Sequence, residues 1–110
     1  MEYRQLPKGK ESISIIGVGT ASIGAAGAKE IEATVAMAAE NGINYFDMAS
    51  ADAAPFEPYG RALSGCRKQV YFQIHFGAQY SSGKYGWTLD LEQVKRSIDW
   101  QLKALKTDYI

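Results

Sequence analysis

The sequence predicts an α/β protein in which parallel strands alternate with helices. Apolar runs at 13–18, 43–49 and 70–77 are rich in β-branched or aromatic residues, which favour strands. Segments with the three- and four-residue spacing of helices separate or follow these runs. Strands that alternate with helices form a parallel sheet with right-handed crossovers. Two architectures fit this order: an open doubly wound sheet, and part of a (β/α)8 barrel.

The first predicted element is a hairpin. A turn is expected at Pro7-Lys8-Gly9, because proline fixes one turn dihedral and glycine permits the other. The isoleucine-rich strand that follows ends at Gly19 and Thr20, and a loop of small residues comes next.

Two helices are predicted before the third strand. The segment 29–42 is rich in alanine and glutamate, and Gly42 stands where a left-handed C-terminal cap is expected. The segment 56–65 forms a shorter helix, which begins close to Glu57 because Pro58 is tolerated only in a first turn.

The most regular helix is predicted at 90–106. Asp90 is placed to cap it, with Gln93 three residues further on as the partner in a capping box. Tyr109 and Ile110 resemble the start of a fourth strand. Together the elements predict a single partial barrel domain over residues 1–110.

The composition is that of a globular domain, with 46% apolar and 22% charged residues. The 12 basic and 12 acidic residues balance, and no basic stripe suggests nucleic acid. No segment is long and apolar enough for a membrane span, so we expect a cytoplasmic protein. Net neutrality does not oppose self-association. The single cysteine, Cys66, excludes an internal disulfide and an all-cysteine metal site, and no metal site is predicted.

The candidate catalytic residues are Asp47 and His75, which end the second and third predicted strands. Barrel enzymes place catalytic groups at the carboxyl ends of strands. On adjacent parallel strands the two side chains can pair, and histidine changes charge near neutral pH, as a general acid requires. The alternatives are an aspartate that caps the next turn and a histidine that is simply hydrogen-bonded at the strand mouth.

The sequence resembles the aldo-keto reductases. The resemblance rests on "SIIGVGTASIG", "AAENGINYFDMA", "EPYGRALSGCRKQVYFQ" and "VKRSIDWQLKALKTDYI", which follow the order of that family over almost the whole chain. These stretches are most similar to the sequences of the branch whose full-length members carry a C-terminal iron-sulfur region. The resemblance implies the N-terminal half of a TIM (β/α)8 barrel preceded by a hairpin.

The resemblance also implies an activity: reduction of small aldehydes and ketones with NADPH and without a metal. Asp47 matches the aspartate of the family, and Gly19 and Thr20 match the turn that lies near the nicotinamide ribose. Asp52 stands at the position of the proton-donating tyrosine, and His75 stands at the position of the lysine. The histidine that follows strand four in the family would fall just beyond residue 110, and no Gly-x-Gly-x-x-Gly motif is present.

Two aromatic features remain open. The loop 78–87 carries Tyr80, Tyr85 and Trp87, which serve either as contacts for a substrate or partner or as a cover folded over the barrel mouth. Tyr59 lies in the second helix and is interpreted as a core or groove residue.

Three functions follow. The first is an aldo-keto reductase-like oxidoreductase fragment, inactive as these 110 residues alone. The second is a catalytically silent half-barrel that forms homo-oligomers through its inner sheet face and two sheet edges, which are expected to carry apolar side chains such as Val18, Phe46 and Ile74. The third is a small-ligand module that uses the glycine-rich strand ends.

Overall fold

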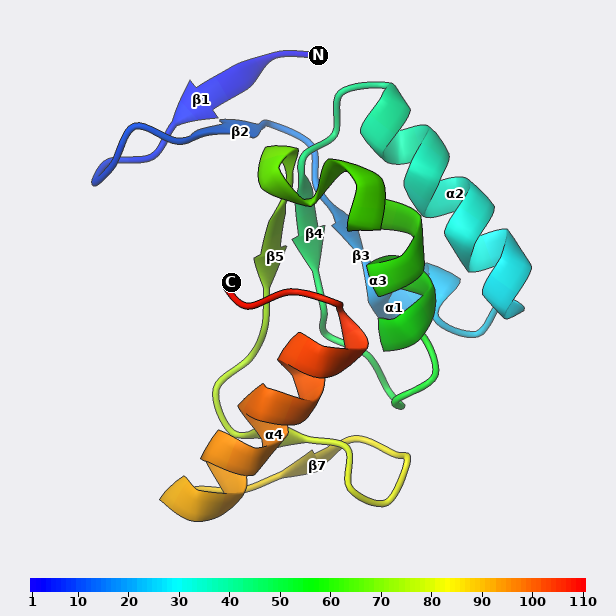
Figure 1. The fold of residues 1–110 in the computed structure, drawn as a ribbon, viewed down its shortest axis with the longest axis vertical. Coiled ribbons are helices and arrows are strands. Elements are labelled where there is room, and N and C mark those ends of the chain that lie inside the picture. Colours follow the sequence, from blue (N-terminus) through cyan, green and yellow to red (C-terminus); the bar gives the residue numbers. More distant parts are fainter.

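A computed structural model describes residues 1–110 and begins with the predicted hairpin. Strands β1 (Tyr3–Gln5) and β2 (Ser12–Ser14) pair antiparallel, and Figure 1 shows them lying across the end of the sheet where its strands begin. Asn44 attaches the hairpin there. Its Oδ1 accepts from the backbone N–H of Ser14 at 2.8 Å, and its Nδ2 donates to the carbonyl oxygen of Ser12 at 2.9 Å.

The central sheet has three parallel strands in the order β3 (Val18–Gly19), β4 (Tyr45–Asp47) and β5 (Tyr71–Gln73). The alternation of parallel strands with helices confirms the predicted fold class, a partial (β/α) barrel preceded by a hairpin. The single strand predicted at 13–18 is divided, because β2 pairs in the hairpin and β3 pairs in the sheet.

The helices are α1 (Thr20–Ile23), α2 (Ala28–Glu40), α3 (Phe56–Leu63) and α4 (Leu91–Ala104), and a 3-10 helix, η1 (Ser64–Gln69), follows α3. Helices α2 and α3 cover one face of the sheet (Figure 1). Strand residues that alternate toward them form the core, where the Phe46 and Phe72 side chains are buried with Ile31, Val35 and Leu63. Burying each such side chain contributes about 1.5–3 kcal/mol.

The segment between β5 and α4 forms an unpredicted second hairpin, β6 (Ala78–Gln79) and β7 (Gly86–Trp87). Helix α4 then begins at the predicted cap, because the Asp90 side chain accepts from the backbone N–H of Gln93 at 2.9 Å. The reciprocal bond of a capping box is absent, since the backbone N–H of Asp90 donates to Oγ1 of Thr88 at 3.1 Å. Helix α4 crosses α3 at Gly60, where a Cβ atom would stand only 2.4 Å from the backbone oxygen of Ala104.

The prediction of a fourth strand at Tyr109 and Ile110 was wrong. Arg67 holds this segment instead of a strand partner. Its guanidinium lies 3.9 Å from the centre of the Tyr109 ring and 4.8 Å from that of Phe72, and it donates to the Tyr109 carbonyl oxygen at 2.6 Å and to Oγ1 of Thr107 at 2.6 Å. Burial lowers the pKa of Arg67, and the neighbouring Tyr109 and Asp108 oppose that change.

None of the helices has the length and apolarity needed to cross a bilayer. The cytoplasmic location stays a prediction.

Candidate active site

The structure brings Asp47 and His75 together at the carboxyl end of the sheet. Asp47 is the last residue of β4, and His75 follows β5 by two residues, so both side chains emerge on the face away from α2 and α3. Nε2 of His75 lies 2.8 Å from Oδ1 of Asp47. The two side chains are 44% and 34% exposed, so a solvent-borne molecule can reach this pair. The pairing predicted from adjacent strands is present.

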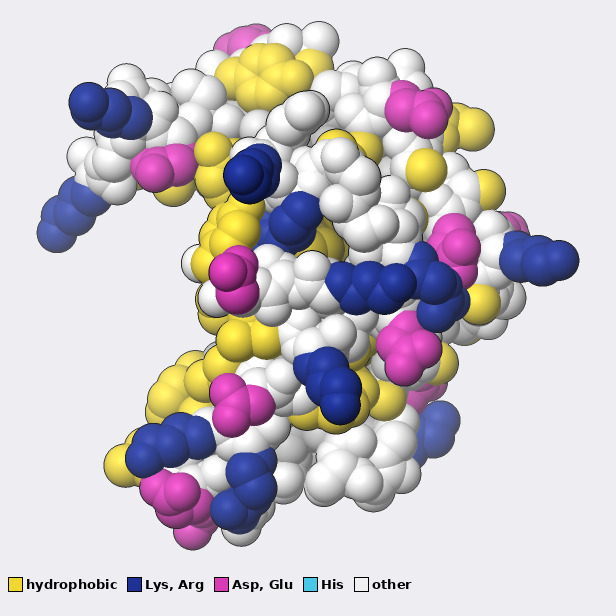
Figure 2. All heavy atoms as spheres, viewed as in Figure 1, with side chains coloured by type: hydrophobic (Ala, Val, Ile, Leu, Met, Phe, Trp, Pro, Cys, Tyr) yellow, Lys and Arg dark blue, Asp and Glu magenta, His cyan; other side chains and the backbone are white.

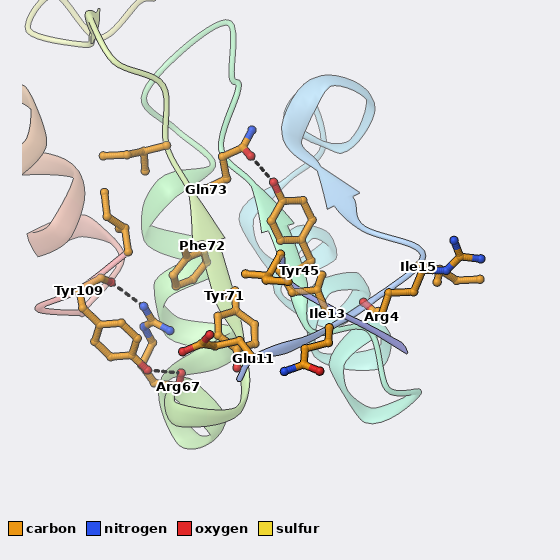
Figure 3. A pocket seen from close by; sticks show the side chains of 15 residues that line it. Arg4, Glu11, Ile13, Ile15, Tyr45, Arg67, Tyr71, Phe72, Gln73 and Tyr109 are labelled. Carbon is orange, nitrogen blue, oxygen red and sulfur yellow. Dashed lines mark hydrogen bonds between the residues drawn. The ribbon is translucent and has the colours of Figure 1, made fainter. Parts of the chain in front are cut away.

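Two residues that the sequence analysis missed extend this pair. Gln73 lies beside Asp47 in the parallel register, and its Nε2 donates to Oδ1 of Asp47 at 3.3 Å. Tyr45 donates its hydroxyl hydrogen to Oε1 of Gln73, as the dashed line in Figure 3 shows. The sequence could have indicated both residues. Side chains two positions apart in a strand lie on the same face of the sheet, so Tyr45 shares a face with Asp47, and Gln73 shares a face with His75.

Neither tyrosine near Asp47 is an activated acid. Burial, and secondarily the negative charge of Asp47, raises the pKa of Tyr45. Burial also raises the pKa of Tyr80, whose hydroxyl donates to the carbonyl oxygen of Ser50 at 3.1 Å. Both phenols therefore hold their protons more firmly than a free tyrosine does.

Asp52, near which the resemblance puts the family tyrosine, is engaged elsewhere. Its Oδ2 lies 3.6 Å from Nζ of Lys84, and its Oδ1 accepts from the backbone N–H of Ala54 at 3.0 Å. Asp52 makes no hydrogen bond to Asp47 or His75. Of the groups gathered here, the His75 imidazole is therefore the one that combines a fixed partner, Asp47, with a second ring nitrogen that can donate a proton.

The predicted cofactor residues Gly19 and Thr20 lie on the other side of Asp47. Gly19 pairs with Asp47 across β3 and β4 and is exposed, so its backbone is accessible to a ligand. The Thr20 side chain is buried, and its Oγ1 has no hydrogen-bond partner. Tyr59 supports this turn from the core, as its hydroxyl donates to the Gly19 carbonyl oxygen at 3.2 Å. This confirms the interpretation of Tyr59 as a core residue.

The face opposite the helices lines an open hollow of about 1080 Å³. Leu6, Ile13 and Ile15 of the N-terminal hairpin contribute to it, together with Ile74 and Ile110. Figure 2 shows hydrophobic side chains gathered along the concave side of the molecule, between the projecting hairpin and the region of α4.

The composition predicted for this inner face was partly wrong. Ile74 lines the hollow, but Phe46 is fully buried on the helix side and Val18 packs against the same core. Phe46 and Val18 share a register position, so both point away from the face that carries Tyr45 and Asp47. The strands therefore present mainly polar and tyrosine side chains to the hollow, and its apolar lining comes largely from the hairpin and residue 110.

The aromatic residues of the loop 78–87 were interpreted either as contacts for a substrate or partner or as a cover folded back over the barrel, and the structure shows both arrangements. Tyr80 folds back into the core, with its ring centre 4.8 Å from that of Phe56 and 5.6 Å from that of Trp100. Tyr85 and Trp87 are 52% and 61% exposed and remain available for contacts.

No protein-family model and no curated protein matches this chain. Solved structures do match. A putative aldo-keto reductase from Pseudomonas aeruginosa superposes with a TM-score of 0.80 and 27% identity over 98% of this chain. The holo form of the aldo-keto reductase AKR11C1 from Bacillus halodurans gives 0.82 and 27% over 100% of this chain.

This is the aldo-keto reductase fold. The resemblance seen in the sequence is thereby confirmed at the level of the family. The chain spans 44% and 38% of the length of those two structures, so it corresponds to part of their barrels. A third structure, an aldo-keto reductase from Klebsiella pneumoniae in complex with NADPH, shares the fold with a TM-score of 0.63 and 24% identity, covering 92% of this chain and 34% of its own. The likeness to the iron-sulfur branch stays a prediction.

Proposed function

We propose that this chain supplies the Asp47–His75 half of an NADPH-dependent reductase for small carbonyl compounds. The hydrogen bond of 2.8 Å between Asp47 and His75 carries the proposal. It places a paired proton donor at the carboxyl ends of the strands, where barrel enzymes have their active sites. The likeness to aldo-keto reductases, which extends over nearly all of this chain, supports the reaction class. The isolated 110 residues are proposed to be inactive, because the chain spans less than half of those structures.

Carbonyl reduction needs a hydride at carbon and a proton at oxygen. Because Asp47 faces Nε2 of His75, the other ring nitrogen, Nδ1, is the atom that delivers the proton to a carbonyl oxygen. Asp47 accepts the hydrogen of Nε2 and thereby fixes which ring nitrogen is left for the substrate. His75 thus combines in one residue the cation and the proton donor that the family divides between a lysine and a tyrosine.

The turn at Gly19 and Thr20 fits one end of the cofactor. The exposed Gly19 permits close approach beside Asp47, whereas the Thr20 side chain is buried, so this turn offers a ligand the exposed backbone at Gly19. NADPH, when bound, supplies the hydride. Gly19 is the residue of this chain that would lie against its nicotinamide end, and Thr20, buried beneath it, would shape the turn.

A chimera tests this function. The chain is joined in one polypeptide to the segment of the Bacillus halodurans structure that it does not cover, and NADPH oxidation is followed with small aldehydes and ketones. We expect turnover in the chimera, none in the isolated chain, and a loss of at least about tenfold in kcat for His75→Ala and Asp47→Asn, in line with general acid catalysis. Lys95→Ala, whose exposed side chain on α4 pairs with Glu92 and with no residue of the site, is the matched control and should retain activity. A folded chimera that leaves NADPH unchanged would contradict the proposal.

A second candidate function is self-association, and the hollow favours it. We propose that a second copy of this chain covers the hollow, because exposed apolar side chains line it and the zero formal net charge does not oppose contact between copies. In this case the half-barrel acts as an assembly module without chemistry.

Two neighbouring isoleucines distinguish a dimer through the hollow from nonspecific hydrophobic association. Ile15 and Ile16 are 50% and 54% exposed, but only Ile15 lines the hollow. Light scattering should show a dimer for the wild type and Ile16→Glu, and a monomer for Ile15→Glu. A monomeric wild type at micromolar concentration, or equal effects of the two variants, would rule out a dimer through this surface.

A further inference from the structure

Besides His75, a chain of two polar residues holds the carboxylate of Asp47. Tyr45 donates to Oε1 of Gln73, and Gln73 in turn donates from Nε2 to Oδ1 of Asp47. We propose that Tyr45 and Gln73 are positioning residues, which fix Asp47 so that Oδ1 faces Nε2 of His75 and Nδ1 is left to exchange the proton. The chemical purpose of this arrangement rests on the proposed function; the arrangement itself does not.

The donor and acceptor roles along the chain follow from the chemistry of each group. A carboxylate oxygen only accepts, so both groups that approach Oδ1 of Asp47 must donate. Gln73 must therefore turn its amide nitrogen toward Asp47, which leaves its oxygen for another donor. The Tyr45 hydroxyl is that donor, and the reverse amide orientation would set the Gln73 oxygen against the carboxylate. Tyr45 thus selects one of the two orientations of the Gln73 amide.

The state of Tyr45 supports a permanent donor. Burial, followed by the charge of Asp47, raises the pKa of Tyr45, so its phenol keeps its hydrogen across the neutral range. The position of the ring also depends on a glycine. A Cβ atom at Gly17 would lie 2.7 Å from Cδ1 of Tyr45, so glycine at this position lets the ring lie against β3's entry.

Orientation then passes from Asp47 to His75. Because Oδ1 faces Nε2, that nitrogen carries a hydrogen in the neutral ring as well as in the cation. The single nitrogen whose protonation changes is Nδ1. Without Gln73 and Tyr45, the exposed carboxylate would rotate more freely and the ring of His75 would lose its fixed direction.

Nitrogen-15 NMR of the labelled 110-residue chain tests this inference without cofactor or substrate. A hydrogen bond to a fixed carboxylate slows solvent exchange, so the Nε2–H signal of His75 should be observed in the wild type slightly above neutral pH. We expect the signal to be lost through exchange in Tyr45→Phe and in Gln73→Met, which nearly preserve side-chain size. Asp47→Asn provides the reference for a disrupted pair.

Tyr71 is the matched control. It is the register partner of Tyr45 on the same sheet face, and its hydroxyl makes no hydrogen bond to the protein, so Tyr71→Phe should keep the His75 signal. Retention of the signal in both Tyr45→Phe and Gln73→Met would show that Asp47 needs no positioning, and would overturn the inference. Its absence from the wild type, or its loss in Tyr71→Phe, would also overturn it. Because no turnover is measured, failure here is distinct from failure of the reductase proposal.

Discussion

Replacing Tyr59 by phenylalanine should change stability in opposite directions at neutral and alkaline pH. Tyr59 is fully buried in α3, with its ring edge-on to Phe46 at 6.2 Å, and its hydroxyl supports Gly19. The substitution preserves the ring and removes only the hydroxyl. At neutral pH we expect Tyr59→Phe to lower the free energy of unfolding by about 1 kcal/mol, the contribution of one intramolecular hydrogen bond.

At alkaline pH we expect the wild type to become less stable than Tyr59→Phe. Burial raises the pKa of Tyr59 from 10.0 to about 12. Between these values the unfolded chain releases a proton that the folded chain retains, so the free energy of unfolding falls as pH rises. The stabilisation is complete below pH 10 and is lost at about 1.4 kcal/mol per pH unit on the way to the folded-state pKa. At pH of about 11 this loss exceeds the hydrogen-bond contribution, and the variant becomes the more stable protein.

Urea unfolding followed by circular dichroism, at several pH values between neutral and about 11, measures both proteins. The raised pKa values of Tyr45 and Tyr80 are present in each, so the difference between the two proteins isolates Tyr59. A difference that stays constant across this pH range would refute the reasoning.

Two further tests probe how the end of α4 and the C-terminal segment are packed. Gly60→Ala places a methyl group against the backbone of α4 and should cost about 1–3 kcal/mol in the free energy of unfolding, whereas Gly65→Ala, which meets nothing within 4 Å, should be neutral or stabilising; equal urea midpoints would contradict this. Arg67→Lys keeps the charge but not the planar fork, so amide hydrogen exchange at residues 107–109 should accelerate; unchanged protection would show that Arg67 does not hold this segment.

The sequence predicted the fold and one pair of site residues because each left a local pattern. Proline and glycine marked the first hairpin, and Asp90 with Gln93 marked the start of α4. Asp47 and His75 could be paired because parallel strands of similar length bring their carboxyl ends together.

Other features depend on contacts that leave little local pattern. Strands β6 and β7 have two residues each, in a segment rich in glycine and serine, so no alternation marks them. Tyr109 resembled a strand residue, yet its place is determined by Arg67, which lies far away in the sequence. The misplacement of Phe46 was avoidable, since it adjoins Asp47 and must point to the opposite face.

Turnover of His75→Gln in the chimera tests the central claim most directly. Glutamine can still donate a hydrogen bond to Asp47 but has no acidic proton to give, so kcat should fall at least about tenfold if His75 donates the proton. His75→Lys, which restores a side chain with an ionisable proton, should recover part of this loss. A kcat in His75→Gln equal to that of the wild type would contradict the assignment of His75 as the proton donor.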